Sequence, residues 1–272
     1  VIIYMYSLIL SPHLDDALYS MSSFLCNHYG DVIIATLFTR EVENDYQGHY
    51  ALYADMKTRK KEDVRAIKKI EEMNMHIRIK MIYLDLPDQI FRSKCSHIEE
   101  PIYDAFHNLH DTYEISAIYC PLGIGKHYDH ILTHNICKEV FHANKTYFYY
   151  DYPYCTLNLN VQTRLNQLGL KQSDTIHCSD MYNHYICPIY SSTPIIFRIF
   201  NILWDSLAGC FQFCNDDDKT KFTTYSYYAI PEDKYKIISR YSSQVKPIFK
   251  DTTNLKHILR TYNKECYIKI HS

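Results

Sequence analysis

The feature that constrains this chain most is a group of metal-binding side chains placed directly after a short apolar segment. Tyr4 to Leu10 has the length and composition of a strand, and Ser11-Pro12 ends it. His13, Asp15 and Asp16 follow at once. Ligands of α/β folds usually bind at the carboxyl ends of strands. His13 and Asp16, three residues apart across a strand-to-helix turn, can therefore converge on one cation and leave Asp15 to transfer a proton.

A second group of the same kind stands more than a hundred residues further along the chain. His127-Tyr128-Asp129-His130 follows the apolar run Ile115 to Cys120. The connecting loop contains Gly123 and Gly125, two of only six glycines, and glycine permits positive φ or close approach of a ligand to the backbone. Because the carboxyl ends of parallel strands meet at one edge of a sheet, we expect the two groups to form one composite site.

Strand-like and helix-like segments alternate through the first half of the chain. The predicted strands are Tyr4–Leu10, Asp31–Thr39, Lys80–Leu86, Ile115–Cys120 and Thr146–Tyr150, and the predicted helices are Ala17–Tyr29, Met56–Asn74, Ile98–His110 and Asp129–Phe141. This alternation predicts an α/β fold, a Rossmann-like sandwich with a mainly parallel central sheet. In the second helix, Val64, Ile67 and Ile70 are expected to face inward.

The weaker pattern beyond Pro153 predicts a C-terminal part packed on this core. We expect a single domain over residues 1–272, in which residues 1–153 form the core layer and residues 154–272 wall the active site. Pro231–Tyr241 and Thr253–Thr261 are predicted helices, whereas residues 155–224 cannot be placed. The apolar run Ile195 to Phe213 contains charged residues and is interpreted as a buried or lid helix, so no transmembrane segment is predicted.

Charge and cysteine usage narrow the class of protein. A net charge of −2 lacks the excess of basic residues that is typical of nucleic-acid-binding proteins. The ten cysteines are scattered along a long chain, which favours reduced thiols and a cytoplasmic protein. No G-x-G-x-x-G follows the first predicted strand, which disfavours a nucleotide-binding oxidoreductase.

The two groups together match the chemistry of a catalytic metal site. Zinc in such a site takes three His or carboxylate ligands and keeps one position for water, and His13, Asp16 and His130 can supply that set. Asp15 is placed to take the proton of the water and pass it to a leaving amine. His127 can stabilise an oxyanion or donate a proton. Asp129 can orient His127 or His130 from behind.

These motifs resemble those of the PIG-L (LmbE-like) family of metal-dependent N-deacetylases. Pro12-His13-Leu14-Asp15-Asp16 and His127-Tyr128-Asp129-His130 correspond to its two hallmarks. Other segments are similar to family motifs as well: Arg59–Asp63, Leu84–Arg92, Tyr149–Tyr154 and Lys234–Phe249. Two positions depart from the pattern: Ala17 replaces an acid found in many relatives, and Gly125 replaces a tyrosine found in some.

The resemblance implies a role for each matching residue. The metal ligands would be His13, Asp16 and His130, with Asp15 as general base and His127 as electrostatic partner. It implies that Arg59 contacts the substrate. Three further residues at strand ends are also candidate substrate contacts: Asp88, Arg92 and Asp151. Since Gly125 lacks a hydroxyl, any second oxyanion donor must come from elsewhere.

We therefore expect a hydrolase of carbon–nitrogen (amide) bonds, a deacetylase that uses zinc (Zn²⁺), with Fe²⁺ or another divalent metal as the alternative. Its partner would be a small N-acetylated sugar or glycoconjugate, with N-acetylglucosamine as the simplest case, attacked by metal-bound water. The loop Arg40 to Ala51 and the region after Pro153 would select the substrate. The competing hypothesis is a non-catalytic Rossmann-like binding or scaffold protein with a structural metal, which would not need Asp15. The sequence does not identify the acylated compound. It also does not determine the oligomeric state, for which a homo-oligomer is one option.

Overall fold

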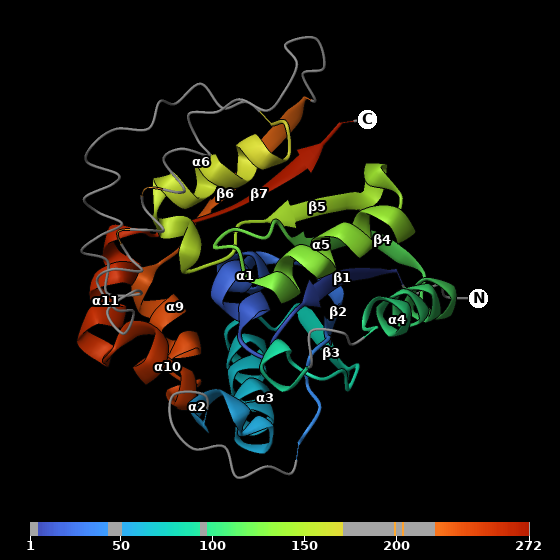
Figure 1. Ribbon diagram of the computed structural model, residues 1–272. Helices are drawn as coiled ribbons and strands as arrows, with labels where there is room; N and C mark the ends of the chain where they lie inside the picture. The colour runs from blue at the N-terminus through green and yellow to red at the C-terminus, as the bar shows by residue number, and fades with distance from the viewer. Residues whose placement is uncertain are drawn as a thin grey trace.

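Figure 1 shows the computed structural model, which describes residues 5–42, 51–92, 97–170 and 221–271 together with positions 199 and 203. Within these residues a seven-stranded sheet has the order β3-β2-β1-β4-β5-β7-β6. The strands are β1 (Tyr6–Ser11), β2 (Gly30–Thr36), β3 (Ile77–Tyr83), β4 (Ile115–Pro121), β5 (Thr146–Tyr149), β6 (Phe222–Tyr228) and β7 (Lys264–Ile270). The first five are parallel, and β7 extends the sheet by pairing antiparallel with both β5 and β6. The predicted α/β class with a mainly parallel sheet is confirmed.

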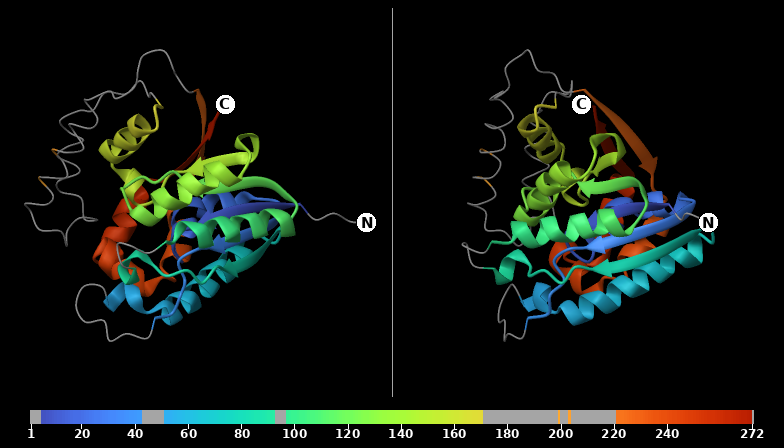
Figure 2. Two further views of the ribbon diagram at one scale, coloured as in Figure 1. Left: turned by 45° about the vertical axis from the view of Figure 1, so that its right-hand side comes forward. Right: turned by 90° about the vertical axis from the view of Figure 1, so that its right-hand side faces the viewer.

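Helices cover both faces of the sheet (Figure 2). They are α1 (Asp16–Asn27), α2 (Ala51–Ala54), α3 (Met56–Met73), α4 (Glu99–Thr112), α5 (Tyr128–Val140), α6 (Asn158–Gln167), α9 (Pro231–Ile238), α10 (Ser242–Phe249) and α11 (Thr252–Thr261), with the short 3₁₀ turns η1 (Gln89–Phe91), η2 (Ala143–Lys145) and η3 (Tyr154–Thr156). None of the helices in the described part of the chain is long and apolar enough to cross a membrane.

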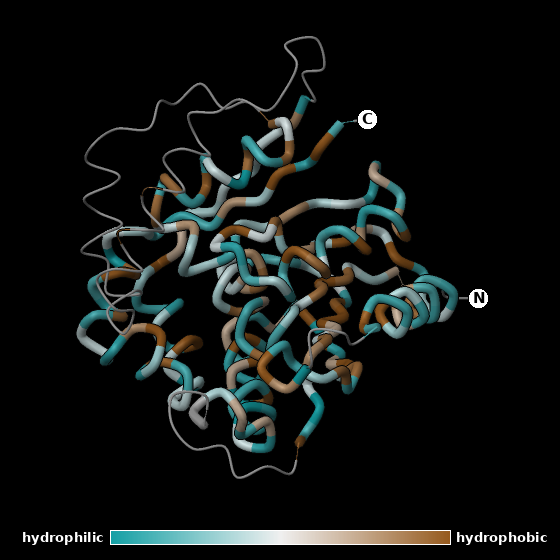
Figure 3. Tube along the Cα trace, viewed as in Figure 1, coloured by the Kyte–Doolittle hydropathy of each residue, from teal (hydrophilic) through white to brown (hydrophobic). Residues whose placement is uncertain are grey.

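Two apolar clusters lie on opposite faces of the sheet, because successive residues of a strand point to opposite sides. Leu8 and Leu10 of β1 belong to the cluster under α4 and α5, whereas Ile9 belongs to the cluster under α1 and α3. Both strand neighbours of β1 repeat this pattern, and Figure 3 shows apolar stretches of the trace along the central strands. A strand that is buried on both faces reads as a continuous apolar run, which is why these strands could be predicted.

The predicted helices Ala17–Tyr29, Met56–Asn74, Ile98–His110 and Asp129–Phe141 are present with shifted ends as α1, α3, α4 and α5. One inward-facing residue of α3 was predicted wrongly. Val64 is 45% exposed, and Ala66 packs inward beside Ile67 and Ile70 instead. Because α3 also buries Glu62 and Asp63 beside the C-terminal part, its inner face is rotated away from Val64.

The C-terminal part joins the core through the sheet and through α10. β7 pairs antiparallel with β5, which the sequence did not predict. Glu62 of α3 accepts hydrogen bonds from the first turn of α10: Ser242 Oγ at 2.7 Å, Ser243 N at 2.9 Å and Ser243 Oγ at 2.6 Å. This carboxylate anchors the N-terminus of α10 to α3. The domain boundaries expected from the sequence stay a prediction.

Two segments discussed above lie largely outside the described residues. Of the apolar run Ile195 to Phe213 only positions 199 and 203 are described, and of the loop Arg40 to Ala51 residues 43–50 are not.

The strand order explains where a site can form. From β1 the chain proceeds outward through β2 to β3, whereas β4 and β5 lie on the other side of β1. The crossovers therefore diverge between β1 and β4, and the crevice at the carboxyl ends of two such strands is the usual ligand site of an open α/β sheet. The two polar groups predicted from the sequence follow these two strands.

Candidate active site

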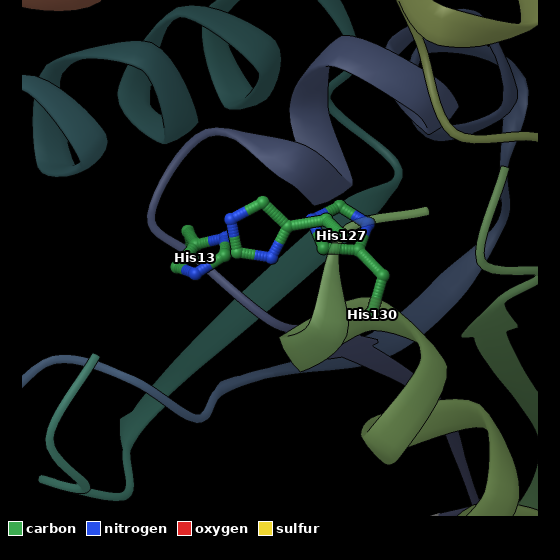
Figure 4. A group of neighbouring side chains, drawn as sticks. All are labelled: His13, His127 and His130. Atoms are coloured by element: carbon green, nitrogen blue, oxygen red, sulfur yellow. The ribbon is translucent and has the colours of Figure 1, made fainter. Parts of the chain in front are cut away.

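Three histidines from the two strand ends meet in one place (Figure 4). Ring centroids are 4.8 Å apart for His13 and His127, 5.4 Å for His13 and His130, and 5.1 Å for His127 and His130. One ring nitrogen from each lies within 4.8 Å of the others, close enough to surround a metal ion. The predicted convergence of residues far apart in the sequence is therefore observed.

Asp16 lies between two of these rings. Its Oδ2 is 3.0 Å from Nδ1 of His13 and 3.1 Å from Nε2 of His130. The same oxygen accepts a hydrogen bond from the backbone N–H of His13 at 2.8 Å. Asp16 is the first residue of α1, so the turn after β1 places His13 and Asp16 on one side of the crevice.

A second carboxylate stands behind each of the two imidazoles. Nδ1 of His130 is 2.6 Å from Oδ1 of Asp151, and Nε2 of His13 is 3.2 Å from Oδ2 of Asp129. Asp88 adds a carboxylate oxygen 3.5 Å from Nε2 of His13. His13 and His130 are thus each held between carboxylates on both sides, the arrangement typical of histidines that bind metals.

The carboxylates dominate the protonation of these two rings. Burial opposes a positive charge on His130, but the charge of Asp16 and the hydrogen bonds of Asp151 and Asp16 raise its pKa to about 10. Burial likewise opposes the charge on His13, yet Asp88, Asp129 and Asp16 raise its pKa well above the ordinary value. A divalent metal ion bound there would replace the protons that these carboxylates otherwise stabilise on the two rings, and two His with one carboxylate are a ligand set of catalytic zinc. The residues therefore fit a divalent metal.

His127 has the opposite electrostatics. It is the N-cap residue of α5, and its Nδ1 accepts a hydrogen bond from the backbone N–H of Asp129 at 3.3 Å. Burial, reinforced by the charges of His13 and His130, lowers the pKa of His127 to about 3. The ring is therefore neutral, and because Nδ1 accepts a hydrogen bond, Nε2 carries the hydrogen.

Asp15 and Arg59 form a buried ion pair beside the histidines. Oδ1 of Asp15 is 3.1 Å from Nη2 of Arg59, and the two residues are only 4% and 3% exposed. Burial raises the pKa of Asp15, and the charge of Arg59 opposes that shift. Arg59 also donates to the backbone oxygen of Tyr53 at 3.2 Å. A guanidinium this buried is part of the site and not a solvated helix charge.

The residues expected to contact the substrate divide into two pairs. Arg59 and Asp88 line a cavity of about 270 Å³ that also contains the three histidines, Asp15 and Asp16. Arg92 and Asp151 do not line this cavity. Asp151 is 1% exposed, and Oδ2 accepts from the backbone N–H groups of residues 123 and 124. Arg92 pairs with Asp129 and donates to the backbone oxygen of Pro87 at 2.8 Å. Asp151 therefore positions His130, and Arg92 positions Asp129, the carboxylate that contacts His13.

The carboxylate of Asp129 also contacts other residues than the sequence predicted. The sequence predicted that it orients His127 or His130, but its carboxylate lies against His13, Arg92 and the backbone N–H of Gln89. Consecutive helical residues point about 100° apart. The side chain of Asp129 therefore leaves the α5 N-terminus in another direction than that of His130.

Sequence reasoning missed several residues of the cavity wall. They are Tyr53, Ile90, Tyr154, Gln244 and Ile248. Four of them lie in the segments Leu84–Arg92, Tyr149–Tyr154 and Lys234–Phe249, which resembled family motifs, but the resemblance gave none of the four a role in the cavity. Tyr53 carries no pattern that distinguishes a cavity wall from ordinary packing.

Fold and site together define an α/β protein with a histidine–carboxylate centre suited to a divalent metal at the switch point of a mainly parallel sheet. Residues 8–141 match the PIG-L family, described as GlcNAc-PI de-N-acetylase. This part of the chain is a PIG-L family domain, which confirms the family predicted from the two motifs. The sequence matches no curated protein.

Solved structures of similar fold include deacetylases. A deacetylase of the teicoplanin biosynthesis pathway, in complex with bog, superimposes with a TM-score of 0.63 at 16% identity, covering 98% of this chain and 99% of the other. The zinc-inhibited form of the teicoplanin deacetylase Orf2 has a TM-score of 0.63 at 15% identity, with 98% and 99% coverage. The A40926 pseudoaglycone deacetylase Dbv21 has a TM-score of 0.63 at 15% identity, with 97% and 96% coverage. At these identities the likeness concerns the fold.

Proposed function

We propose that this protein is a metal-dependent N-deacetylase that hydrolyses the acetamide of an N-acetylated amino sugar or a sugar-containing metabolite. The observation that carries the proposal is the position of Asp16 between His13 and His130, with the carboxylate of Asp15 in the same cavity. The family description and the fold shared with deacetylases support it.

The chain would hold the metal through Nδ1 of His13, Oδ2 of Asp16 and Nε2 of His130. A divalent cation bound there would lower the pKa of a water molecule and polarise the acyl carbonyl. Asp129 and Asp151 would keep the hydrogen of each imidazole on the nitrogen that faces away from the cation. Zinc suits this ligand set best, and Fe²⁺ is the alternative.

Asp15 would act as the general base. It does not bridge the two histidines as Asp16 does, and its Oδ1 faces Arg59. It would accept the proton of the attacking water and return it to the amine that leaves. Arg59 would hold the carboxylate in place during both transfers.

His127 would stabilise the oxyanion of the tetrahedral intermediate. Its low pKa keeps it neutral, and its Nε2–H is the hydrogen left to donate after Nδ1 is bound to the Asp129 backbone. A fixed hydrogen-bond donor in a buried cavity is an effective way to stabilise developing negative charge.

An amino sugar is the substrate class that the comparisons favour. The family description names a GlcNAc-containing compound, and two deacetylases of similar fold act in teicoplanin biosynthesis and on A40926 pseudoaglycone. A cavity of about 270 Å³ is large enough for a small molecule to enter with its acyl group first.

The test is acetate release from N-acetylglucosamine and its glycosides by the full chain supplied with Zn²⁺ or Fe²⁺. Asp15→Asn should lower kcat by about 100-fold or more while the metal is retained. His130→Ala should lose the metal, and His107→Ala, at an exposed position of α4, is the matched control. Metal bound without acetate release from any sugar amide would favour the non-catalytic binding protein. Unchanged turnover of Asp15→Asn would remove Asp15 from its role.

A further inference from the structure

The loop between β4 and α5 needs support from outside itself. Three of its residues have positive φ: Gly123 at +85°, Gly125 at +90° and Lys126 at +63°. Glycine has many accessible conformations, and a lysine at positive φ is unfavourable, so the sequence of this loop does not hold one conformation by itself. His127, to which we assign oxyanion stabilisation, follows directly. The position of its imidazole therefore depends on the contacts that fix the loop.

Arg164 makes one of these contacts. It lies on α6, in the C-terminal part of the chain, and is only 7% exposed. Its Nε donates a hydrogen bond to the backbone oxygen of Leu122 at 2.8 Å. A Cβ at position 123 would lie 3.2 Å from both Nε and Nη2 of Arg164. The guanidinium therefore rests on the backbone of Gly123, and glycine permits this close approach.

The same peptide unit is held from its other side by Asp151. The carbonyl of Leu122 accepts from Arg164, and the N–H of Gly123, which belongs to the same peptide, donates to Oδ2 of Asp151 at 2.9 Å. Burial lowers the pKa of Arg164, and the negative charge of Asp151 opposes this shift. The peptide is thus clamped between a guanidinium and a carboxylate, and hydrogen bonds in such a chain strengthen one another.

The helix that carries Arg164 is itself fixed in the core. Val161 and Leu165 of α6 are buried in the apolar cluster that also lies under α4 and α5. They flank Arg164 on the helix, three residues before it and one after it. Because α6 is packed in this way, its guanidinium is a fixed point against which the loop can be set.

We infer that Arg164 is a positioning residue for His127: by clamping the Leu122–Gly123 peptide against Asp151 it fixes the loop that places the imidazole in the cavity. The inference rests on the proposed deacetylase function. Arg164 does not line the cavity, so it reaches neither the substrate nor the metal ligands directly. Its removal should therefore lower kcat and leave KM nearly unchanged, as loss of an interaction made only in the transition state does.

The test is a double-mutant cycle on kcat, measured with the zinc-loaded full chain and a glycoside of N-acetylglucosamine. Arg164→Met keeps most of the side-chain volume and removes the hydrogen bond. It should lower kcat about tenfold in the wild type but less than about twofold in His127→Ala, because a misplaced imidazole matters only where the imidazole is present. Arg164→Lys retains a donor and should recover part of the loss.

Val161→Ala is the matched control on the same helix. It creates a cavity beside α6 and costs stability, but it removes no contact with the loop. It should leave kcat unchanged at a temperature at which all variants are folded. Equal fold losses from Arg164→Met in the two backgrounds, or an unchanged kcat in the wild-type background, would overturn the inference while deacetylation stands.

A second readout does not depend on turnover. In zinc-loaded protein with ¹⁵N-labelled histidine, the NMR signals of His127 are those absent from His127→Ala. The wild type should show the hydrogen on Nε2, because Nδ1 accepts from the backbone N–H of Asp129. Arg164→Met should shift or broaden the His127 signals, and Val161→Ala should not. If no sugar amide releases acetate, the proposed function fails and these spectra decide the inference, which unchanged His127 signals in Arg164→Met would overturn.

Discussion

Oδ1 of Asp151 lies 2.6 Å from Nδ1 of His130, and the two side chains are 1% and 3% exposed. The other oxygen of Asp151 accepts hydrogen bonds from the backbone N–H groups of Gly123 and Ile124 at 2.9 Å and 2.8 Å. One carboxylate after β5 therefore joins the loop after β4 to a histidine on α5. It turns Nε2 of His130 toward Asp16.

Asp151→Asn is expected to weaken metal binding about 10- to 100-fold, because the neutral amide holds the His130 ring less firmly and makes it a poorer ligand. The measurement is the metal Kd by competition with a chelator. Asp85→Asn is the matched control, since Asp85 follows β3 at the far edge of the sheet and its side chain is 66% exposed. An unchanged metal Kd in Asp151→Asn would contradict the support that we assign to this carboxylate.

Gly125→Ala is expected to disturb the loop that carries His127. An added Cβ would lie 2.5 Å from Cγ of Tyr154, and φ of +90° is already unfavourable for alanine. We expect a loss of stability of about 1–3 kcal/mol together with reduced turnover. Gly30→Ala is the control, because Gly30 also has positive φ but has nothing within 4 Å of the added atom. Loss of turnover in both variants, measured beside urea unfolding, would assign the effect to backbone strain alone.

Lys234→Met should destabilise the protein by about 3 kcal/mol, because it leaves the buried charge of Glu265 without its partner. Nζ of Lys234 is 2.7 Å from Oε1 of Glu265, and both side chains are 2% exposed. Lys236 on the same helix forms a 2.7 Å pair with Asp233, but its side chain is 54% exposed. Lys236→Met should therefore cost less than about 1 kcal/mol in urea unfolding. If both variants lost the same free energy of unfolding, burial of the Lys234–Glu265 pair would not be the cause of the loss.

Asp63 should make stability depend on pH. Burial raises its pKa to about 7, although hydrogen bonds from Tyr241 at 2.6 Å and Tyr83 at 3.0 Å oppose the shift. The folded state therefore binds the proton more tightly than the unfolded state, where the pKa is 3.8. The stabilisation from protonated Asp63 is fully present below about pH 4 and is lost as pH rises to about 7.

Asp63→Asn should remove this dependence. Between about pH 5 and about pH 8 the free energy of unfolding of the wild type should fall relative to the variant by on the order of 2 kcal/mol. Thermal or urea unfolding at several pH values measures the difference. Asp111→Asn, at a 79% exposed side chain, should follow the wild type. A constant difference between wild type and Asp63→Asn across this range would show that Asp63 is ionised throughout.

The sequence predicted those parts of the fold that short stretches determine. The five parallel strands and α1, α3, α4 and α5 are visible as apolar runs and helical periodicities, because burial on both faces or on one stripe imposes its pattern locally. β6 and β7 were missed. β6 is largely exposed at the sheet edge, and β7 contains the charged residues Lys264, Glu265 and Lys269, so neither shows the apolar run of a central strand.

At the site, the sequence by itself determined the two motifs and, through the parallel topology, that they would meet. Only the tertiary structure decided what stands behind them: Asp129 against His13, Asp151 against His130, Arg92 against Asp129, and α10 in the cavity wall. These contacts join residues 21 to more than one hundred positions apart. A hydrogen bond across such a distance depends on how whole elements pack, and neighbouring residues in the sequence carry no record of it.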